Sequence, residues 1–308
     1  MKSGYQAYIN ELAGLWAGRI ERDVPMSTLS SLKVGGPAAG VCYPASTADL
    51  SSLLKVLSRL AISWQVVGRG SNILVADSGL AGVVILLGPE LGRIQPLAGE
   101  GLLHVEAGRS LAGLLDWCVD RGLSGLEFAA GIPGTVGGAL KMNAGAWGHD
   151  MSEVVEAAEL MNREGRISRH DFRPGELSYR SWPGLGENII TAVIFQLCLA
   201  DSEEIKARCR ELTQWRRAKQ PKDASAGSFF KNPPDEAAGR LIEAAGLKGL
   251  RVGGAMVSEK HANFLVNKQG ATARDFVRLM RLVQEKVKAA SGIYLEPEVR
   301  LMGRFDDP

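Results

Sequence analysis

The sequence has few of the residues that bind metals or form disulfides. Its four cysteines, Cys42, Cys118, Cys198 and Cys209, form no C-x-x-C pair, and its four histidines give no H-E-x-x-H spacing. Neither a zinc site nor a thioredoxin-like redox site is supported. We expect the cysteines to be small, buried apolar residues. Any chemistry should then depend on an organic cofactor or on polar side chains, with no metal.

The sequence also lacks an excess of charge and a long apolar run. The formal net charge is +2 over 308 residues, with basic and acidic residues interspersed. Nucleic acid is therefore not an expected partner, whereas a small anionic substrate stays open. No stretch approaches the roughly 20 apolar residues that span a bilayer, and residues 1–25 carry no signal-peptide pattern. We expect a cytoplasmic protein with no membrane partner.

What the chain does have is alternating helix and strand patterns, which predict an α+β protein. Apolar residues at helical spacing, with Ser, Thr or Asp near the start, predict helices. These lie over residues 46–60, 110–122, 201–220, 235–246 and 272–292. Short β-like runs predict strands, which lie over residues 41–44, 63–68, 82–88, 102–108, 188–200, 255–258, 263–267 and 293–303. We expect three parts, residues 1–88, 89–200 and 201–308.

The chain is rich in glycine, with 37 residues that gather in clusters. In one cluster, GRGSN at residues 68–72, the spacing invites a dinucleotide-binding interpretation. That fingerprint needs a helix directly after the glycines, whereas ILVADSGLAGVVIL follows here and is strand-like. Two interpretations remain, a plain hairpin turn or a loop whose backbone N–H groups bind phosphate with help from Ser71 and Asn72.

A second cluster, GIPGTVGGALKMNAGAWG at residues 131–148, sets glycines among apolar residues without the polar residues of a surface turn. Glycine in such numbers costs backbone entropy on folding. Close approach of the backbone to a flat or anionic cofactor would offset that cost. Tight packing of two backbone segments is the alternative.

Several motifs, taken together and in order, resemble one family. They are LKVGGPA, VVGRGSNILVADSGLAGVVI, GIPGTVGGALKMNAGAWG, LSYR, RRAKQP, AGSFFKNP, GAMVSEKHANFLVN and LEPEVRLMG. The family is that of the UDP-N-acetylenolpyruvoylglucosamine reductases, flavoenzymes of peptidoglycan precursor synthesis and cell-wall biogenesis. The resemblance runs almost from end to end of the chain.

This resemblance implies a fold and a reaction. The fold is a two-subdomain FAD-binding fold of the vanillyl-alcohol-oxidase and p-cresol-methylhydroxylase type, followed by a C-terminal α+β substrate-binding domain. In the reaction NADPH reduces a non-covalently bound FAD, which passes hydride to the enolpyruvyl group of UDP-N-acetylglucosamine enolpyruvate. The product is UDP-N-acetylmuramate. We expect a monomer or a weak oligomer.

The resemblance also implies three catalytic residues, Arg180, Ser228 and Glu298. Hydride addition leaves negative charge that spreads onto the substrate carboxylate, so a planar cation such as Arg180 suits it, with Glu298 orienting the same end. Ser228 would then donate the proton. Taken alone, each has an ordinary interpretation as a surface arginine, a turn serine and a salt-bridge glutamate. Glu296 is close enough in sequence to be confused with Glu298.

The binding residues that the resemblance implies fall into two sets. Those for FAD are Gly68, Arg69, Gly70, Ser71, Asn72, Gly131, Gly134, Thr135, Gly137, Gly138, Asn143, Gly145 and Ala146. Those for the substrate are Tyr179, Arg216, Lys219, Lys231 and Asn232. Arg216 and Lys219 have a simpler explanation, since cations are favoured at a helix C-terminus.

The sequence departs from the family pattern in two places. Only SWPGLGE separates Arg180 from the strand NIITAVIF, so the chain resembles the shorter form of the family, without a tyrosine-bearing capping loop. His149 follows the Asn-Ala-Gly-Ala motif, which leaves a covalent flavin link open. Two other functions also stay open, another flavoprotein oxidoreductase of the same fold and a flavin-free nucleotide-sugar-binding protein.

Overall fold

The structure, a computed structural model, describes residues 2–305, with side chains from Tyr8 onward. Met1 and residues 306–308 lie outside the described residues. They are the outermost residues of the expected parts 1–88 and 201–308. The chain forms two compact units, each assembled from separate segments. The first is Met1–Arg22, Gly40–Arg69 and Gly82–Arg216, and the second is Asp23–Ala39, Gly70–Ala81 and Arg217–Pro308. The expected division into three parts stays a prediction.

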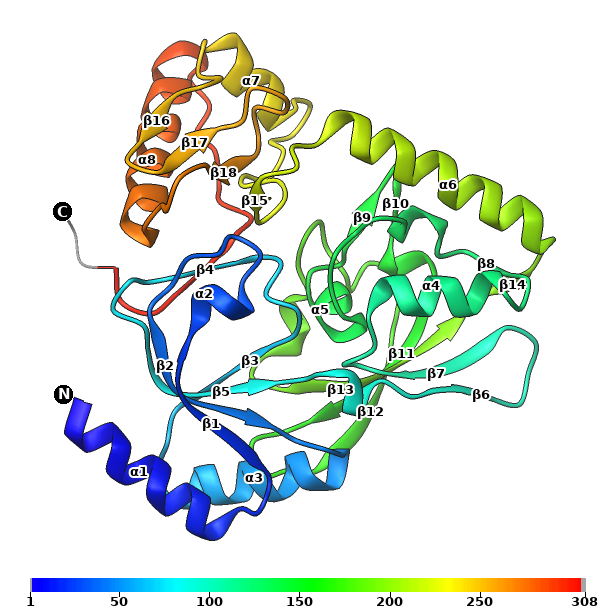
Figure 1. Ribbon diagram of the computed structural model, residues 1–308. Helices are drawn as coiled ribbons and strands as arrows, with labels where there is room; N and C mark the ends of the chain where they lie inside the picture. Colours follow the sequence, from blue (N-terminus) through cyan, green and yellow to red (C-terminus); the bar gives the residue numbers. More distant parts are fainter. Residues whose placement is uncertain (1, 306–308) are drawn as a thin grey trace. The chain divides into compact units, whose positions relative to one another are not determined.

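Among the described residues, five helices fall where the apolar periodicity predicts them, and the first, second and fifth helices were not predicted (Figure 1). The helices are α1 (Lys2–Leu15), α2 (Met26–Leu29), α3 (Thr47–Arg59), α4 (Leu111–Val119), α5 (Val136–Lys141), α6 (Ser202–Lys219), α7 (Ala238–Ala244) and α8 (Ala273–Ser291). Local capping explains several starts. The side chain of Ser46 accepts a hydrogen bond from the Asp49 backbone N–H at α3, and Ser110 does the same for Gly113 at α4.

A five-stranded antiparallel sheet forms the centre of the first unit, in the order β12-β11-β13-β7-β6. Its strands are β6 (Ile94–Pro96), β7 (Leu102–Glu106), β11 (Val155–Met161), β12 (Ile167–Asp171) and β13 (Ile189–Gln196). The middle strand, β13, is buried at every position except Gln196. Burial on both faces explains why its sequence is a continuous apolar run.

A four-stranded sheet has the order β1-β2-β5-β3. Its strands are β1 (Arg19–Pro25), β2 (Pro37–Tyr43), β3 (Trp64–Val67) and β5 (Leu80–Leu86). The leucine stripe of α3 is buried in the main hydrophobic core of the first unit, together with Leu12 and Trp16 of the chain's first segment. The Trp16 indole N–H donates to the Asp49 carboxylate at 2.7 Å, which ties that segment to α3.

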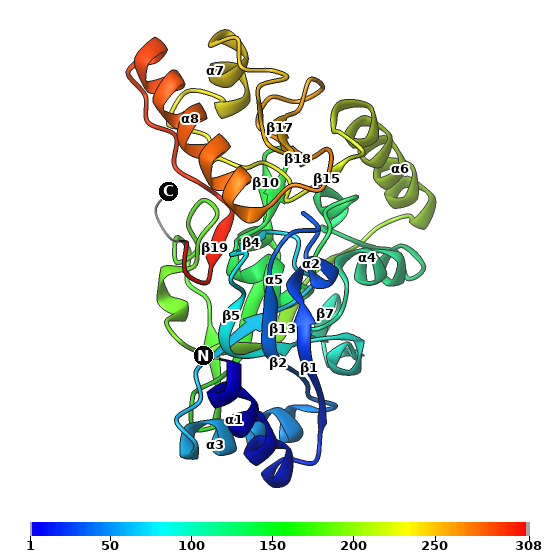
Figure 2. The ribbon, with the colours of Figure 1, turned by 60° about the vertical axis from the view of Figure 1, so that its left-hand side comes forward.

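The second unit contains a small antiparallel sheet in the order β15-β18-β17-β16. Its strands are β15 (Ala224–Ser225), β16 (Arg251–Val252), β17 (Ala255–Val257) and β18 (Leu265–Asn267). Both views show α8 alongside this sheet (Figures 1 and 2). Thr272 and Asp275 form a capping box at its start, and Gly292 ends it in the left-handed region.

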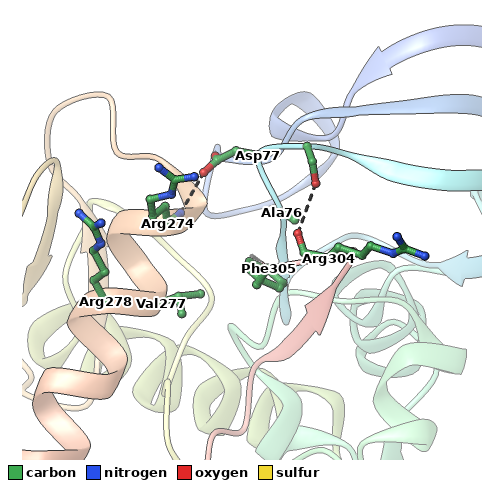
Figure 3. A pocket seen from close by; sticks show the side chains of 8 residues that line it. Ala76, Asp77, Arg274, Val277, Arg278, Arg304 and Phe305 are labelled. Atoms are coloured by element: carbon green, nitrogen blue, oxygen red, sulfur yellow. Dashed lines mark hydrogen bonds between the residues drawn. The ribbon is translucent and has the colours of Figure 1, made fainter. Parts of the chain in front are cut away.

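Segments distant in sequence meet within the second unit. Strand β4 (Ile73–Val75) pairs in parallel with β19 (Arg300–Met302) near the end of the chain. The Asp77 carboxylate accepts hydrogen bonds from the backbone N–H groups of Ala273 and Arg274 at the start of α8. Figure 3 shows the bond between Asp77 and Arg274, beside a pocket of about 100 Å³ whose lining includes Arg278 and Arg304. Its described lining includes no residue predicted for the site.

Two sequence expectations need correction. Cys42 and Cys118 are buried as predicted, but Cys209 is only partly buried and Cys198 is exposed. Cys198 lies in β14 (Cys198–Leu199), a two-residue strand that pairs with β8 (Leu123–Ser124) outside the core. The predicted terminal strand over 293–303 is also too long, because only Arg300–Met302 forms it. The segment before it contributes only an isolated bridge between Pro297 and Phe230, since proline has no N–H to extend a ladder.

No helix among the described residues is both long and apolar enough to cross a membrane.

Candidate active site

The glycines of the 131–148 cluster lie close to other parts of the first unit. A Cβ at Gly68 would lie 2.4 Å from Thr135 Oγ1, and one at Gly137 would lie 2.8 Å from Ala107 Cβ. Thr135 is the N-cap of α5, where its hydroxyl accepts from the Gly138 N–H at 3.4 Å. Close packing against the side chains of Thr135 and Ala107 therefore accounts for Gly68 and Gly137.

Two buried donors beside this cluster nevertheless favour a bound ligand. The indole Nε1 of Trp147 and the guanidinium Nε of Arg216 are buried and find no hydrogen-bond partner among residues 2–305. Buried N–H groups in folded proteins are normally satisfied. The surroundings of the cluster thus fit a molecule rich in acceptor atoms, as a flavin nucleotide and a nucleotide sugar both are.

The segment after α5 forms a tight hairpin, in which β9 (Gly145–Ala146) pairs with β10 (His149–Asp150). Asn143, just before it, is buried and has a φ of +38°. Its amide nitrogen donates to Asp150 Oδ2 at 3.0 Å and to the Ser178 carbonyl at 3.2 Å. Asn143 therefore holds the hairpin against the loop that carries Arg180, and its predicted contact with FAD stays a prediction.

Arg180 lies at the tip of a two-residue turn closed by a bridge between Ser178 and Ser181. Its φ of +55° is unusual for a residue other than glycine. Its guanidinium donates to the carbonyls of Gly145 at 2.8 Å and Asn143 at 3.4 Å. A strained residue held by specific bonds is a common feature of functional sites.

Two further predicted residues lie with Arg180 in the first unit. Tyr179 is 48% exposed. The centroid of its ring lies 4.8 Å from the Arg180 Cζ. The pKa of Arg216 is lowered, mainly by burial and also by the positive charge of Arg180. Two cations held close together in a partly buried place provide a binding site for an anion.

The second unit holds the other two catalytic candidates by backbone pairing. Phe229, which follows Ser228, donates its backbone N–H to the Asn263 carbonyl at 2.7 Å and accepts from the Glu298 N–H at 2.9 Å. Phe229 and Phe230 are both fully buried. These anchors fix the backbone on the C-terminal side of Ser228 and bring it beside Glu298.

Asn263 is a supporting residue that the sequence did not predict. It is 2% exposed, and its side chain accepts from the Phe230 N–H at 3.0 Å and donates to the Phe230 carbonyl at 2.8 Å. A buried asparagine that replaces a β-ladder in this way fixes the segment after Ser228. Its only signal in the sequence is a polar residue inside the run HANFLVN.

Glu296 and Glu298 have different surroundings. The Glu296 carboxylate accepts from Lys231 Nζ at 2.5 Å, and its carbonyl accepts from the Lys231 N–H at 2.8 Å. The carbonyl of Glu298 accepts instead from the Asn72 side chain at 3.1 Å. The structure thus brings Asn72 to Glu298, and it pairs the predicted substrate residue Lys231 with Glu296.

The remaining predicted residues are distributed as follows. Gly70 has a φ of +65°, and a Cβ there would lie 1.9 Å from the Leu29 carbonyl oxygen, so glycine is required. Ser71 accepts a hydrogen bond at its carbonyl from the Ser31 hydroxyl at 3.4 Å. Arg69 is exposed, and Lys219 is the last residue of α6. Gly134 accepts at its carbonyl from the Leu111 N–H at 3.1 Å.

A pocket of about 540 Å³ adjoins Ser228 in the second unit. Its lining includes Asn232, Arg240, Lys260 and His261, and also one carboxylate, Glu243, which accepts from Lys248 Nζ at 2.6 Å. The Asn232 side chain accepts from the Ala238 N–H at 3.0 Å, which orients it at the start of α7. The pocket is large enough for part of a drug-sized ligand and presents cationic and amide groups that suit an anionic molecule.

His261 makes the stability of the protein sensitive to acid. Burial lowers its pKa below the ordinary 6.5, and its Nδ1 accepts from the Asn263 N–H at 3.2 Å. Below pH 6.5 the unfolded chain gains a proton that the folded chain does not, so the free energy of unfolding falls with falling pH. We expect His261→Gln to flatten this fall in urea unfolding curves measured between pH 7 and pH 5. An unchanged pH dependence would contradict this origin.

His149, the candidate for a covalent flavin link, is exposed in the hairpin. Its Nδ1 lies 2.7 Å from Glu153 Oε2. The side chain is thus engaged with a carboxylate on the same segment, and non-covalent FAD stays the expectation.

Known protein families match both the N-terminal and the C-terminal part of the chain. A family model described as UDP-N-acetylenolpyruvoylglucosamine reductase, C-terminal domain, matches residues 220–302, and one described as FAD binding domain matches residues 38–171. The UDP-N-acetylenolpyruvoylglucosamine reductase of Pelobacter propionicus is 42% identical over 294 residues, which are 95% of this chain and 99% of its own. That of Geobacter metallireducens is 46% identical over 288 residues, 93% and 95% of the two chains.

The fold agrees with these matches. The crystal structure of UDP-N-acetylenolpyruvylglucosamine reductase from Thermus caldophilus is similar to this chain with a TM-score of 0.80 and 38% identity. The similarity covers 93% of this chain and 100% of that one. The expected α+β fold, with an FAD-binding portion followed by a C-terminal domain, is confirmed.

Proposed function

Because the chain belongs to the UDP-N-acetylenolpyruvoylglucosamine reductase family, we propose that it reduces the enolpyruvyl group of UDP-N-acetylglucosamine enolpyruvate to give UDP-N-acetylmuramate. The reaction belongs to peptidoglycan precursor synthesis, which we assign to the cytoplasm. The observation that carries the assignment at the level of the site is Ser228, held by buried phenylalanines beside Glu298 and next to a pocket suited to an anion.

FAD is the cofactor of the proposal, with NADPH as the reductant. The chemistry that FAD supplies when bound is hydride transfer, from NADPH and then to the methylene carbon of the enolpyruvyl group. The residues that would hold it are those of the two glycine clusters, with Thr135 at the start of α5 and Ser71 and Asn72 after Gly70.

Arg180 is the residue we assign to the substrate carboxylate. As hydride adds, negative charge grows on that carboxylate, and a planar guanidinium can stabilise it through two parallel hydrogen bonds. The carbonyls of Asn143 and Gly145 already fix the orientation of this guanidinium. It therefore needs little reorganisation as charge develops. Glu298 is assigned to orient the same end of the substrate.

Ser228 is the residue we assign to proton donation. The carbon next to the carboxylate must gain a proton, and a hydroxyl can supply it only when it is held in position. The buried Phe229 and Phe230, with Asn263 behind them, provide that rigidity. The alkoxide that Ser228 would leave is favoured by nearby cations, and Lys260 also lines the pocket that Ser228 adjoins.

Five residues are proposed to bind the substrate outside the reacting group. They are Tyr179 and Arg216 in the first unit, and Lys219, Lys231 and Asn232 in the second. The three cations of this set suit the diphosphate of a UDP-sugar, and the aromatic ring and the amide suit its sugar. The short 181–187 segment supports the form without a capping loop, and we propose a monomer or a weak oligomer.

Steady-state oxidation of NADPH under anaerobic conditions tests the proposal. Purified protein loaded with FAD should oxidise NADPH only when UDP-N-acetylglucosamine enolpyruvate is present, and the same assay with NADH gives the nicotinamide preference. UDP-N-acetylglucosamine, which lacks the enolpyruvyl group, is the matched control. Activity with other acceptors alone would favour a different flavoprotein oxidoreductase. Failure to take up flavin would favour a nucleotide-sugar-binding protein.

A further inference from the structure

Two tryptophans lie in edge-to-face contact beside the arginines of the first unit. The indole rings of Trp147 and Trp215 have centroids 4.4 Å apart and planes at 81°. Trp147 belongs to the turn between β9 and β10, and Trp215 lies near the end of α6. The contact therefore joins a loop and a helix that are far apart in the sequence.

Each tryptophan lies close along the chain to a group that holds or precedes an arginine. Trp147 follows the β9 strand, in which the Gly145 carbonyl accepts a hydrogen bond from Arg180 Nη2 at 2.8 Å. Trp215 immediately precedes Arg216 on α6. Contact between the two rings thus fixes the distance between the Gly145 carbonyl, which accepts from Arg180, and the backbone of Arg216.

The two arginines need such a connection because their positive charges repel each other. Burial and the charge of Arg180 both disfavour the charged form of Arg216. Without a constraint, a long side chain of this kind turns toward water. Gly131, with a φ of +76°, makes room for the buried position, since a Cβ there would lie 2.9 Å from Arg216 Cδ.

Local structure does not explain the tryptophans themselves. Trp147 and Gly148 are the central residues of a two-residue hairpin and have φ values of +64° and +85°. Such turns favour Asn-Gly, and a bulky residue at the first position is strained. Trp215 is a large apolar residue that is nevertheless 49% exposed. An aromatic contact that serves the site accounts for both departures.

We propose that Trp147 and Trp215 form an aromatic clamp that holds Arg216 beside Arg180, so that the two cations together bind an anionic group of the substrate. The inference rests on the proposed function. Both tryptophans are positioning residues, because they act through the arginines and not on the reacting atoms.

Trp147→Asn tests the clamp without endangering the hairpin. It creates the Asn-Gly sequence that suits the turn best, while it removes the ring. We expect the KM for UDP-N-acetylglucosamine enolpyruvate to rise about tenfold. Reduction of the bound flavin by NADPH should stay within about twofold of the wild type. Trp147→Phe, which keeps an aromatic edge, should recover most of the loss.

A second variant and a control make the test specific. Trp215→Leu should raise the KM as Trp147→Asn does, and the double variant should be no worse than either single variant, since both remove one contact. Trp117→Leu removes an indole that instead stacks on Arg121 in the first unit, and it should leave the KM unchanged.

Three results would overturn the clamp. They are an unchanged KM in Trp147→Asn, an equal loss in both half-reactions, and additive effects in the double variant. A wild-type protein that reduces no enolpyruvyl substrate would contradict the proposed function itself, and the inference with it. The wild-type control therefore separates the two failures.

Discussion

Ser228→Ala should leave reduction of the bound flavin by NADPH nearly intact, while reoxidation by UDP-N-acetylglucosamine enolpyruvate slows by about 10³- to 10⁴-fold. Only the second half-reaction requires a proton on the carbon next to the carboxylate, and alanine has none to give. The fold should persist, because the backbone of this segment is anchored by Phe229, Phe230 and Asn263 and not by the serine. Anaerobic stopped-flow absorbance of the flavin measures both half-reactions.

Two further variants define what the loss at Ser228 means. Ser228→Cys keeps a group that can donate a proton and should recover part of the rate. Ser225→Ala, in the neighbouring strand β15, should behave as the wild type. If Ser228→Ala slowed both half-reactions equally, the serine would be a structural residue and the proton-donor role would be wrong.

Arg180→Lys should slow flavin reoxidation by about 10²- to 10³-fold, even though it keeps the positive charge. A guanidinium is a rigid, planar fork that can donate to two carbonyls and a carboxylate at once, whereas the single ammonium group of lysine cannot. The bonds to Asn143 and Gly145 that orient the guanidinium would be lost. Single-turnover reoxidation at saturating substrate reports the effect on the chemical step, and a titration reports the effect on binding.

The matched control for Arg180 is Arg173→Lys. Arg173 is exposed, lies earlier on the same loop and contacts neither hairpin carbonyl in the bonds of the described residues. It should therefore change neither rate. A fully active Arg180→Lys protein would show that charge alone is needed, and the argument from the guanidinium geometry would fail.

Much of the secondary structure could be predicted because its signals are local. The helix over Thr47–Arg59 follows from a leucine stripe after Ser46, and α8 follows from the capping pair Thr272 and Asp275. The strands after GRGSN were predicted from the strand-like pattern of ILVADSGLAGVVIL, and β4 and β5 confirm them. In each case neighbouring residues contain the whole signal.

Long-range pairing could not be predicted in the same way. Strand β4 pairs with β19 through Ile73 and Arg300, residues that are far apart in the sequence. Residues 23–39 and 70–81 join the second unit, although the sequence around them continues into the first. A local pattern shows that a strand has a buried face, but it does not identify the partner strand.

The site was predicted only where the family resemblance named residues. The residues that support these site residues were not predicted, because their role depends on contacts between distant parts of the chain. Asn263 is recognisable only once its amide is seen to bond Phe230, and Trp147 only once its ring is seen against Trp215. Cys198 was expected to be buried, but a two-residue edge strand leaves it exposed.

The most direct test of the central claim is a single anaerobic turnover. The protein, loaded with FAD and bleached with one equivalent of NADPH, is mixed with UDP-N-acetylglucosamine enolpyruvate, and the flavin absorbance and the mass of the sugar nucleotide are followed together. The account predicts prompt return of the absorbance with one equivalent of a product heavier by two hydrogen atoms. A flavin that stays bleached, with the sugar nucleotide unchanged in mass, would contradict it.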